Sequence, residues 1–163
     1  MKIKLCLALL LFLAGAGTAQ ASGRHGLILN AEGPLELFAS MGANYDLYDV
    51  PVGEDRPSIS DFYLYYGMNR YTATLEGKTG ETVTLFAQPD FGKKAGYLII
   101  RKLDDRPVWL LDLAGFPPDT WHRVPAQGRY GAYEVYFHPA PDFDKNIASV
   151  KWGRWWQGET PGS

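Results

Sequence analysis

The chain has 163 residues, 18 of them acidic and 16 basic, and a single cysteine, Cys6. This length suits one domain with its own hydrophobic core. The acidic excess argues against binding to nucleic acid, whose phosphates require a basic surface. Because Cys6 lies close to the first residue, the rest of the chain can offer neither a thiol nucleophile nor a cysteine-ligated zinc.

Residues 1–21 have the pattern of a secretory signal peptide. Lys2 and Lys4 precede an apolar run over residues 5–13, and Ala-Gln-Ala at residues 19–21 provides a small-x-small cleavage site. The run is shorter than the about 20 residues that cross a bilayer as a helix. We therefore predict cleavage after Ala21, with a retained anchor as the alternative, and a periplasmic or extracellular protein without stable membrane insertion. Residues 22–163 are expected to form a single domain.

Two segments before residue 61 fit more than one structure. Residues 34–42 have a proline at the first position and a glycine at the last, which is typical of a short helix. Their leucines also alternate with other residues, as they would in a strand. Residues 44–60 contain two prolines and four acidic side chains, which indicates a long surface loop or a weak edge strand.

Seven later segments have either the apolar-polar alternation or the short apolar run of a strand. The predicted strands are residues 61–66, 71–76, 81–85, 97–103, 108–113, 132–138 and 147–152. Those at 61–66 and 71–76 are expected to pair, and those at 71–76 and 81–85 to form a hairpin with one buried and one solvated face. The strands at 97–103 and 108–113 are partly apolar on both faces, which predicts central positions. The expected fold class is all-β, an antiparallel β-sandwich or jelly roll.

Two turns in the second half of the chain each lead into a predicted strand. Gly77-Lys78-Thr79-Gly80 leads into the strand at 81–85, and Pro125-Ala126-Gln127-Gly128-Arg129-Tyr130 leads into Glu134-Val135-Tyr136. Over residues 61–138 this order resembles small secreted β-sandwiches of the bacterial pre-peptidase C-terminal type, including the periplasmic inhibitors of g-type lysozyme. The resemblance implies a binding protein, most concretely an inhibitor of a lysozyme-type hydrolase. It lies in turn residues, which indicate the fold more than the function.

A short phrase, Pro-Asp-Phe-x-Lys, occurs twice. Asp90 and Phe91 belong to the first copy, and Asp142 and Phe143 belong to the second. Each copy follows an alternating strand, where proline ends the ladder and aspartate favours a turn. The phrase therefore indicates either two equivalent strand exits or a duplicated ligand-binding loop.

The titratable residues do not form a recognisable catalytic or metal-binding motif. The three histidines, His25, His122 and His138, lack the spacing of a catalytic zinc site, and Asp104 and Asp105 fit a tight turn. Residues 142–146 match the first three ligand positions of a calcium loop but lack its glycine and final glutamate. We predict a protein that is not an enzyme and carries no cofactor, with a looser calcium site as the alternative.

Exposed aromatic side chains are the strongest candidates for binding. Tyr63 and Tyr65 are expected on the solvated face of their strand, where they would form a flat platform. Arg154, Trp155 and Trp156 follow the last predicted strand, and the two tryptophans fit either a binding surface or a cover for a second hydrophobic cluster.

Three functions follow from these features. The first is inhibition of a lysozyme-type hydrolase, in which the acidic segment 44–60 would meet a basic enzyme. The second is a carbohydrate-binding module that uses Tyr63, Tyr65, Trp155 and Trp156 as stacking surfaces. The third is a structural subunit of the cell envelope. The expected partner is therefore a protein, such as a glycan hydrolase, or a glycan.

Overall fold

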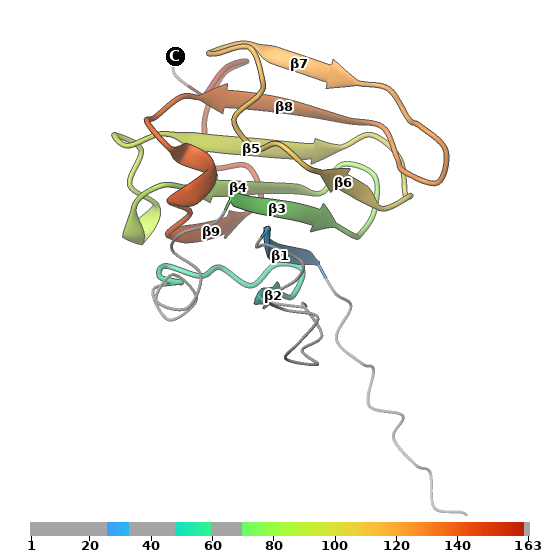
Figure 1. Cartoon of the computed structure of the whole chain (residues 1–163). Coiled ribbons are helices and arrows are strands. Elements are labelled where there is room, and N and C mark those ends of the chain that lie inside the picture. Colours follow the sequence, from blue (N-terminus) through green and yellow to red (C-terminus); the bar gives the residue numbers. More distant parts are fainter. Residues whose placement is uncertain (1–25, 33–47, 60–69, 162–163) are drawn as a thin grey trace, which may run out of the picture.

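The computed structural model describes residues 26–32, 48–59 and 70–161 (Figure 1). In this part of the chain, two antiparallel sheets pack face to face, which confirms the predicted all-β sandwich. One sheet has four strands in the order β2-β1-β3-β6, and the other has five in the order β7-β8-β5-β4-β9. The strands are β1 (Leu27–Glu32), β2 (Tyr48–Val50), β3 (Arg70–Leu75), β4 (Thr82–Phe86), β5 (Tyr97–Lys102), β6 (Val108–Leu110), β7 (Trp121–Val124), β8 (Tyr133–His138) and β9 (Ser149–Trp152).

Helical structure in the described residues consists of two single turns, η1 (Pro89–Phe91) and η2 (Phe143–Lys145). Each begins within one copy of the repeated phrase. Among the described residues, no helix has the length and apolar character needed to cross a membrane. The predicted helix or strand at 34–42 and the predicted strand at 61–66 lie outside the described residues.

The predicted hairpin over 71–76 and 81–85 is wrong. β3 belongs to the four-stranded sheet and β4 to the five-stranded sheet, so the turn at 77–80 joins the two layers. Alternation could not reveal this, because a strand buries one face whether its neighbour in the chain lies beside it or across the core. Gly77 and Gly80 have φ values of +121° and +87°, which glycine adopts at little cost.

The strands predicted at 97–103 and 108–113 are also in different sheets. β5 lies at the centre of the five-stranded sheet, as expected, whereas β6 is an edge strand of the other. The prediction of a central position failed for β6 because Trp109, on its outward face, is apolar and yet 41% exposed. Two strands, β1 and β7, were not predicted, and β2 is a short edge strand within the segment 44–60.

The main core lies between the sheets and includes alternate side chains of β4, β8 and β9, which the pleat sends to the same face. These are Val83 and Leu85 of β4, Val135 and Phe137 of β8, and Val150 of β9. Trp152, two positions after Val150 on β9, is partly buried against this core.

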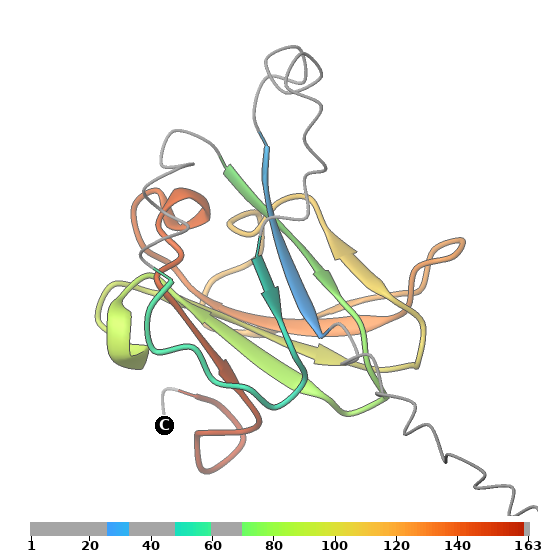
Figure 2. The ribbon, with the colours of Figure 1, turned by 90° about the horizontal axis from the view of Figure 1, so that it is seen from below.

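A second hydrophobic cluster covers the outer face of the five-stranded sheet. Its buried members are Phe86, Tyr97, Ile99, Tyr136 and Trp156. The segment beyond β9, red in Figures 1 and 2, returns over this sheet on the side away from the four-stranded sheet. We call residues 153–161 the C-terminal strap.

Candidate functional site

A groove of about 450 Å³ lies between the edge strand β6 and the β7–β8 hairpin. It is lined by Trp109, Leu111, Val124, Pro125, Gln127, Gly128, Arg129, Tyr130, Gly131 and Tyr133. Its two sides come from different sheets, because β6 is an edge of the four-stranded sheet and β7 an edge of the five-stranded one. We call it the aromatic groove.

Trp109 and Leu111 are the large hydrophobic side chains that the described part of the chain leaves exposed. Their exposed fractions are 41% and 48%, and both side chains line the aromatic groove. Trp109 is the central residue of β6, and Leu111 follows the last residue of that strand. The Trp109 ring lies against Tyr130, with 5.3 Å between the ring centroids and 37° between the ring planes. Tyr130 therefore packs against the Trp109 ring.

The hairpin that carries Tyr130 has a tight tip. The amide of Gln127 donates to the carbonyl of Tyr130 at 3.1 Å, and the amide of Tyr130 donates back to Gln127 at 3.0 Å. Gly128, with φ +57°, takes the first central position, where two-residue hairpins of type II′ place glycine.

Asp104 ties the two sides of the aromatic groove together. Its carboxylate accepts from the amide of Ala132 at 3.0 Å and from the amide and guanidinium of Arg106, so one side chain joins the β5–β6 turn to the hairpin. These hydrogen bonds, first from Ala132 and then from Arg106, lower the pKa of Asp104 to about 2. A side chain at Gly131 would collide with the Asp104 carboxylate, which explains a glycine at this close approach. The sequence prediction that Asp104 serves a turn agrees with this geometry.

Lys102 adds a second connection from inside the sandwich. It is fully buried, and its ammonium donates to the carbonyls of Leu75 on β3 and Arg106. Burial lowers the pKa of this ammonium, while nearby carboxylates, Asp104 foremost, act in the opposite direction. Lys102 thus links β5 to the opposite sheet close to the turn that precedes β6.

The two Pro-Asp-Phe phrases lie at one end of the five-stranded sheet. Both β4 and β8 pair with β5, and Phe86 and His138, near their ends, flank Tyr97. Asp90 and Asp142 both adopt the left-handed conformation, with φ values of 54° and 50°. The copies differ at the phenylalanine, because Phe91 is also left-handed, with φ 60°, whereas Phe143 begins the turn η2.

The two phenylalanines of the phrase point to different clusters. Phe143 is fully buried in the main core, 5.3 Å from the Phe137 ring. Phe91 is partly buried against the outer cluster, 5.9 Å from the Phe86 ring. This difference favours two strand exits over a duplicated ligand-binding loop.

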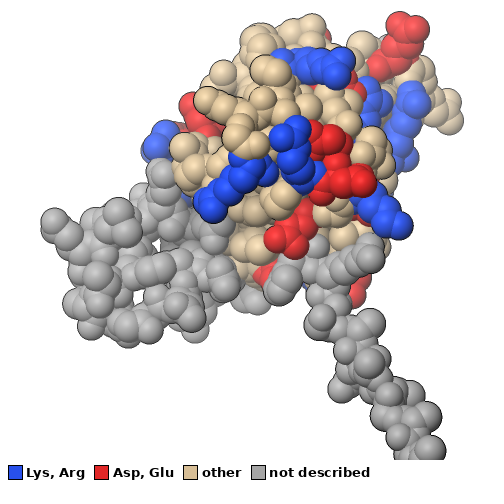
Figure 3. All heavy atoms as spheres, turned by 90° about the vertical axis from the view of Figure 1, so that its right-hand side faces the viewer, with Lys and Arg blue, Asp and Glu red and all other residues tan. Residues whose placement is uncertain are grey.

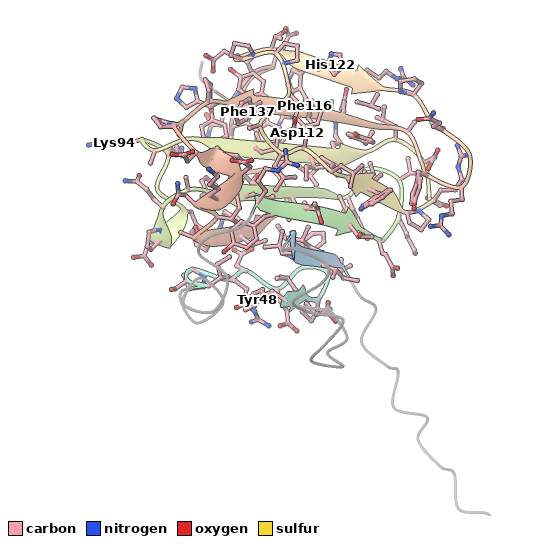
Figure 4. All side chains as sticks on the ribbon, in the orientation of Figure 1. Tyr48, Lys94, Asp112, Phe116, His122 and Phe137 are labelled. Carbon is pink, nitrogen blue, oxygen red and sulfur yellow. The ribbon has the colours of Figure 1, made fainter. Side chains whose placement is uncertain are left out.

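A second pocket, of about 460 Å³, lies where the two phrases approach each other. Pro89 and Pro141, one from each phrase, are among its lining residues, with Lys94 and Asn146 as the longer polar ones. Lys94 extends away from the sheet (Figure 4). Asp90 and Asp142 are exposed and are not among the lining residues. Asp142 forms an ion pair with Lys145 at 3.2 Å.

Arg154, Trp155 and Trp156 belong to the C-terminal strap. Trp156 is 8% exposed and packs in the outer cluster, and Trp155 packs beside it, donating from Nε1 to the hydroxyl of Thr84 at 2.8 Å. Arg154 lies over the Trp156 ring at 5.3 Å. Of the two interpretations of these tryptophans, the cover for a second cluster agrees with the structure. Tyr63 and Tyr65 lie outside the described residues.

The histidines of the described part are on the surface. His138 Nδ1 lies 2.7 Å from the Asp119 carboxylate, and both side chains are exposed. His122 is exposed on β7, 6.3 Å from the Phe116 ring (Figure 4). In the described residues no hydroxyl is hydrogen-bonded to either histidine, and no three His, Cys, Asp or Glu side chains could together hold a metal ion.

The described part of the acidic segment is bound to the rest of the protein. Asp55 accepts from Lys151 at 2.9 Å and from the amide of Trp152 at 2.8 Å, and Glu54 pairs with Arg56. On the face shown in Figure 3, basic side chains likewise lie beside acidic ones. Glu54 and Asp55 are therefore already paired with cations of their own chain.

Comparison of the chain with protein-family models, with curated proteins and with solved structures found no match.

The aromatic groove was not among the sequence-based candidates. The available signal was a tyrosine directly after the Gln-Gly-Arg hairpin tip and a tryptophan on a three-residue strand. The sequence does not show that these two residues line one groove, because that follows from the positions of β6 and β7 at the edges of the two sheets.

Tyr97 in the outer cluster is expected to make the protein sensitive to alkali. Burial first, and then Tyr136 and Asp119, raise its pKa to about 12 from the unfolded value of about 10. The unfolded chain therefore loses the phenol proton first, so stability is complete below about pH 10 and falls as the pH rises toward 12. Tyr97→Phe should reduce this loss by about 1–2 kcal/mol, after allowance for solvent screening.

Urea unfolding of the wild type and Tyr97→Phe at about pH 9 and about pH 11 measures the effect. Tyr130→Phe, which removes a hydroxyl outside the outer cluster, is the matched control. Equal loss of stability in the wild type and Tyr97→Phe would contradict the prediction.

Proposed function

We propose that the protein is an exported, non-catalytic binding protein that holds a carbohydrate chain in the aromatic groove. The observation that carries this proposal is the exposure of Trp109 and Leu111 at one place in the described structure. Exposed apolar side chains that cluster in a concave site are typical of ligand binding.

The chemistry of the groove suits a sugar. An exposed indole offers a flat apolar face for the C–H side of a pyranose ring, and tyrosines combine an apolar body with a hydroxyl. Gln127, Tyr130 and Tyr133 place amide and hydroxyl groups along the same groove, where they can meet sugar hydroxyls. The tight hairpin tip and the Asp104 connection support a groove that exists before the ligand arrives, which limits the entropy lost on binding.

Inhibition of a lysozyme-type hydrolase is a weaker alternative. It rests on the resemblance and on the acidic segment, but Glu54 and Asp55 are paired with cations of their own chain. Their charge would attract a basic enzyme less than free carboxylates would.

Trp109→Ala tests the proposal. The wild type should be retained on insoluble glycans such as purified peptidoglycan sacculi, with a change in tryptophan fluorescence on binding. Loss of the exposed indole is expected to weaken binding by at least about tenfold, in the range of a binding hot spot. The measurement is depletion from solution at increasing amounts of glycan.

Trp155→Ala, which removes a tryptophan on another face of the sandwich, is the matched control and should bind as the wild type does. If Trp155→Ala loses binding and Trp109→Ala keeps it, the aromatic groove is not the site. Inhibition of lysozyme at nanomolar protein without retention on glycan would support the inhibitor instead. Failure in both assays would favour the structural subunit.

A further inference from the structure

We infer that the carbohydrate bound in the aromatic groove carries carboxylate groups and that Arg129 recognises them. This inference rests on the proposed function and adds the charge of the ligand to it. It follows from the distribution of charge in the groove and from the way in which Arg129 is held.

The aromatic groove differs in charge from the chain as a whole. Acidic residues outnumber basic ones in the sequence, 18 to 16, yet none of the residues that line the groove is acidic. Arg129 is the charged member of the lining. The neighbouring carboxylate, Asp104, is already paired with Arg106 at 2.7 Å. A ligand in the groove therefore meets a positive charge that no lining carboxylate offsets.

Arg129 is held by the uncharged side chain of Tyr130. Its guanidinium carbon lies 5.0 Å from the centroid of the Tyr130 ring, and one terminal nitrogen donates to the Tyr130 hydroxyl at 2.7 Å. Within the described residues it forms no ion pair. A guanidinium has five N–H groups, so the contact with Tyr130 leaves donors for a ligand. Two parallel N–H groups fit a carboxylate well.

Tyr130 connects the charge to the stacking surface. It contacts Trp109 at 5.3 Å and Arg129 at 5.0 Å, so indole, phenol and guanidinium form one continuous group. A sugar stacked on Trp109 would place its substituents near Arg129. A carboxylate on the sugar would give Arg129 an anionic partner, which it lacks among the described residues.

A matched pair of soluble ligands tests the inference. Oligogalacturonate carries one carboxylate on each sugar, and its methyl ester has the same sugar skeleton without the charge. Calorimetric titration of the whole exported protein should give binding of the acidic oligomer at least about tenfold tighter than binding of the ester. The preference should shrink as salt is added, since the arginine is exposed.

Four variants separate the roles of the charge and of the stacking surface. Arg129→Gln should abolish the preference for the acidic oligomer while retaining binding of the ester, and Arg129→Lys should keep part of the preference. Arg123→Gln, which removes an exposed arginine of β7 that does not line the groove, should leave both affinities unchanged. Trp109→Ala should weaken the binding of both oligomers.

The outcomes distinguish the inference from the proposed function. Equal binding of the acid and the ester, or a preference that survives in Arg129→Gln, would overturn the inference, and binding that depends on Trp109 would leave the proposed function standing. A polyglutamate peptide that binds as tightly as oligogalacturonate would overturn the assignment to carbohydrate. No binding of either oligomer or of sacculi by the wild type would overturn both.

Discussion

Replacing Trp156 by alanine is expected to lower the free energy of unfolding by about 3–5 kcal/mol, the range found when a large buried aromatic side chain is removed. The side chain is 8% exposed and packs 5.8 Å from Trp121 and 5.6 Å from Trp155. Its loss would open a cavity between the C-terminal strap and the sheet. Chemical denaturation followed by circular dichroism would measure the change.

Trp109→Ala is the matched control, because it makes the same substitution at a site that is 41% exposed. It should change stability by less than about 1 kcal/mol, as surface substitutions usually do. The two variants should therefore lose different properties. Trp109→Ala should lose binding to glycan, and Trp156→Ala should lose stability. Similar destabilisation by both would mean that Trp109 is part of the packed core.

The strap has a structural role that alternation alone could not reveal. Thr84 points away from the main core, so its strand was expected to have a solvated face, yet it is fully buried. Trp155 of the strap covers Thr84 and donates a hydrogen bond to its hydroxyl. Trp121 of β7 donates from Nε1 to the carbonyl of Glu159, which attaches the strap to the sheet at a second place. The five-stranded sheet is thus covered on both faces, by the other sheet and by the strap.

Local patterns predicted six of the described strands, β3, β4, β5, β6, β8 and β9, but neither β1 nor β7, and they did not predict how the strands pair. The inward positions of β4, β8 and β9 followed from period-two alternation, because the pleat sends successive side chains to opposite faces. Sheet membership depends on whether a turn keeps the chain in one layer or crosses to the other. The turns at 77–80 and 104–107 both cross, and their composition is also that of hairpin turns.

The candidate site was harder to predict for the same reason. Trp109 lies in an apolar run that suggested a central strand, but it is exposed because it lies on the outward face of the edge strand β6. Trp155 and Trp156 had two interpretations, and the choice between them required the path of the strap over the sheet. Phe91 and Phe143 share a sequence phrase, and only their places in the fold separate them.

The different burial of Phe91 and Phe143 predicts a large difference in stability between their alanine variants. Phe143→Ala is expected to lower the free energy of unfolding by about 3–5 kcal/mol, since the ring is fully buried and its removal leaves a cavity in the main core. Phe91→Ala makes the same change in the same phrase, but that ring is partly exposed at the edge of the outer cluster. It should cost about 1–2 kcal/mol, for the area that the ring does bury. Urea unfolding of the two variants under identical conditions measures the difference.

The comparison also tests the origin of the repeated phrase. If both copies only end strands, the cost of each substitution should follow the burial of its ring, and neither variant should change binding to glycan. A duplicated ligand-binding loop predicts instead that both variants weaken binding by similar factors while the folded state persists. The left-handed aspartates, Asp90 and Asp142, are compatible with both, because that conformation serves a turn equally well with or without a ligand. The burial of the two rings is what separates the alternatives, and it favours the strand exits.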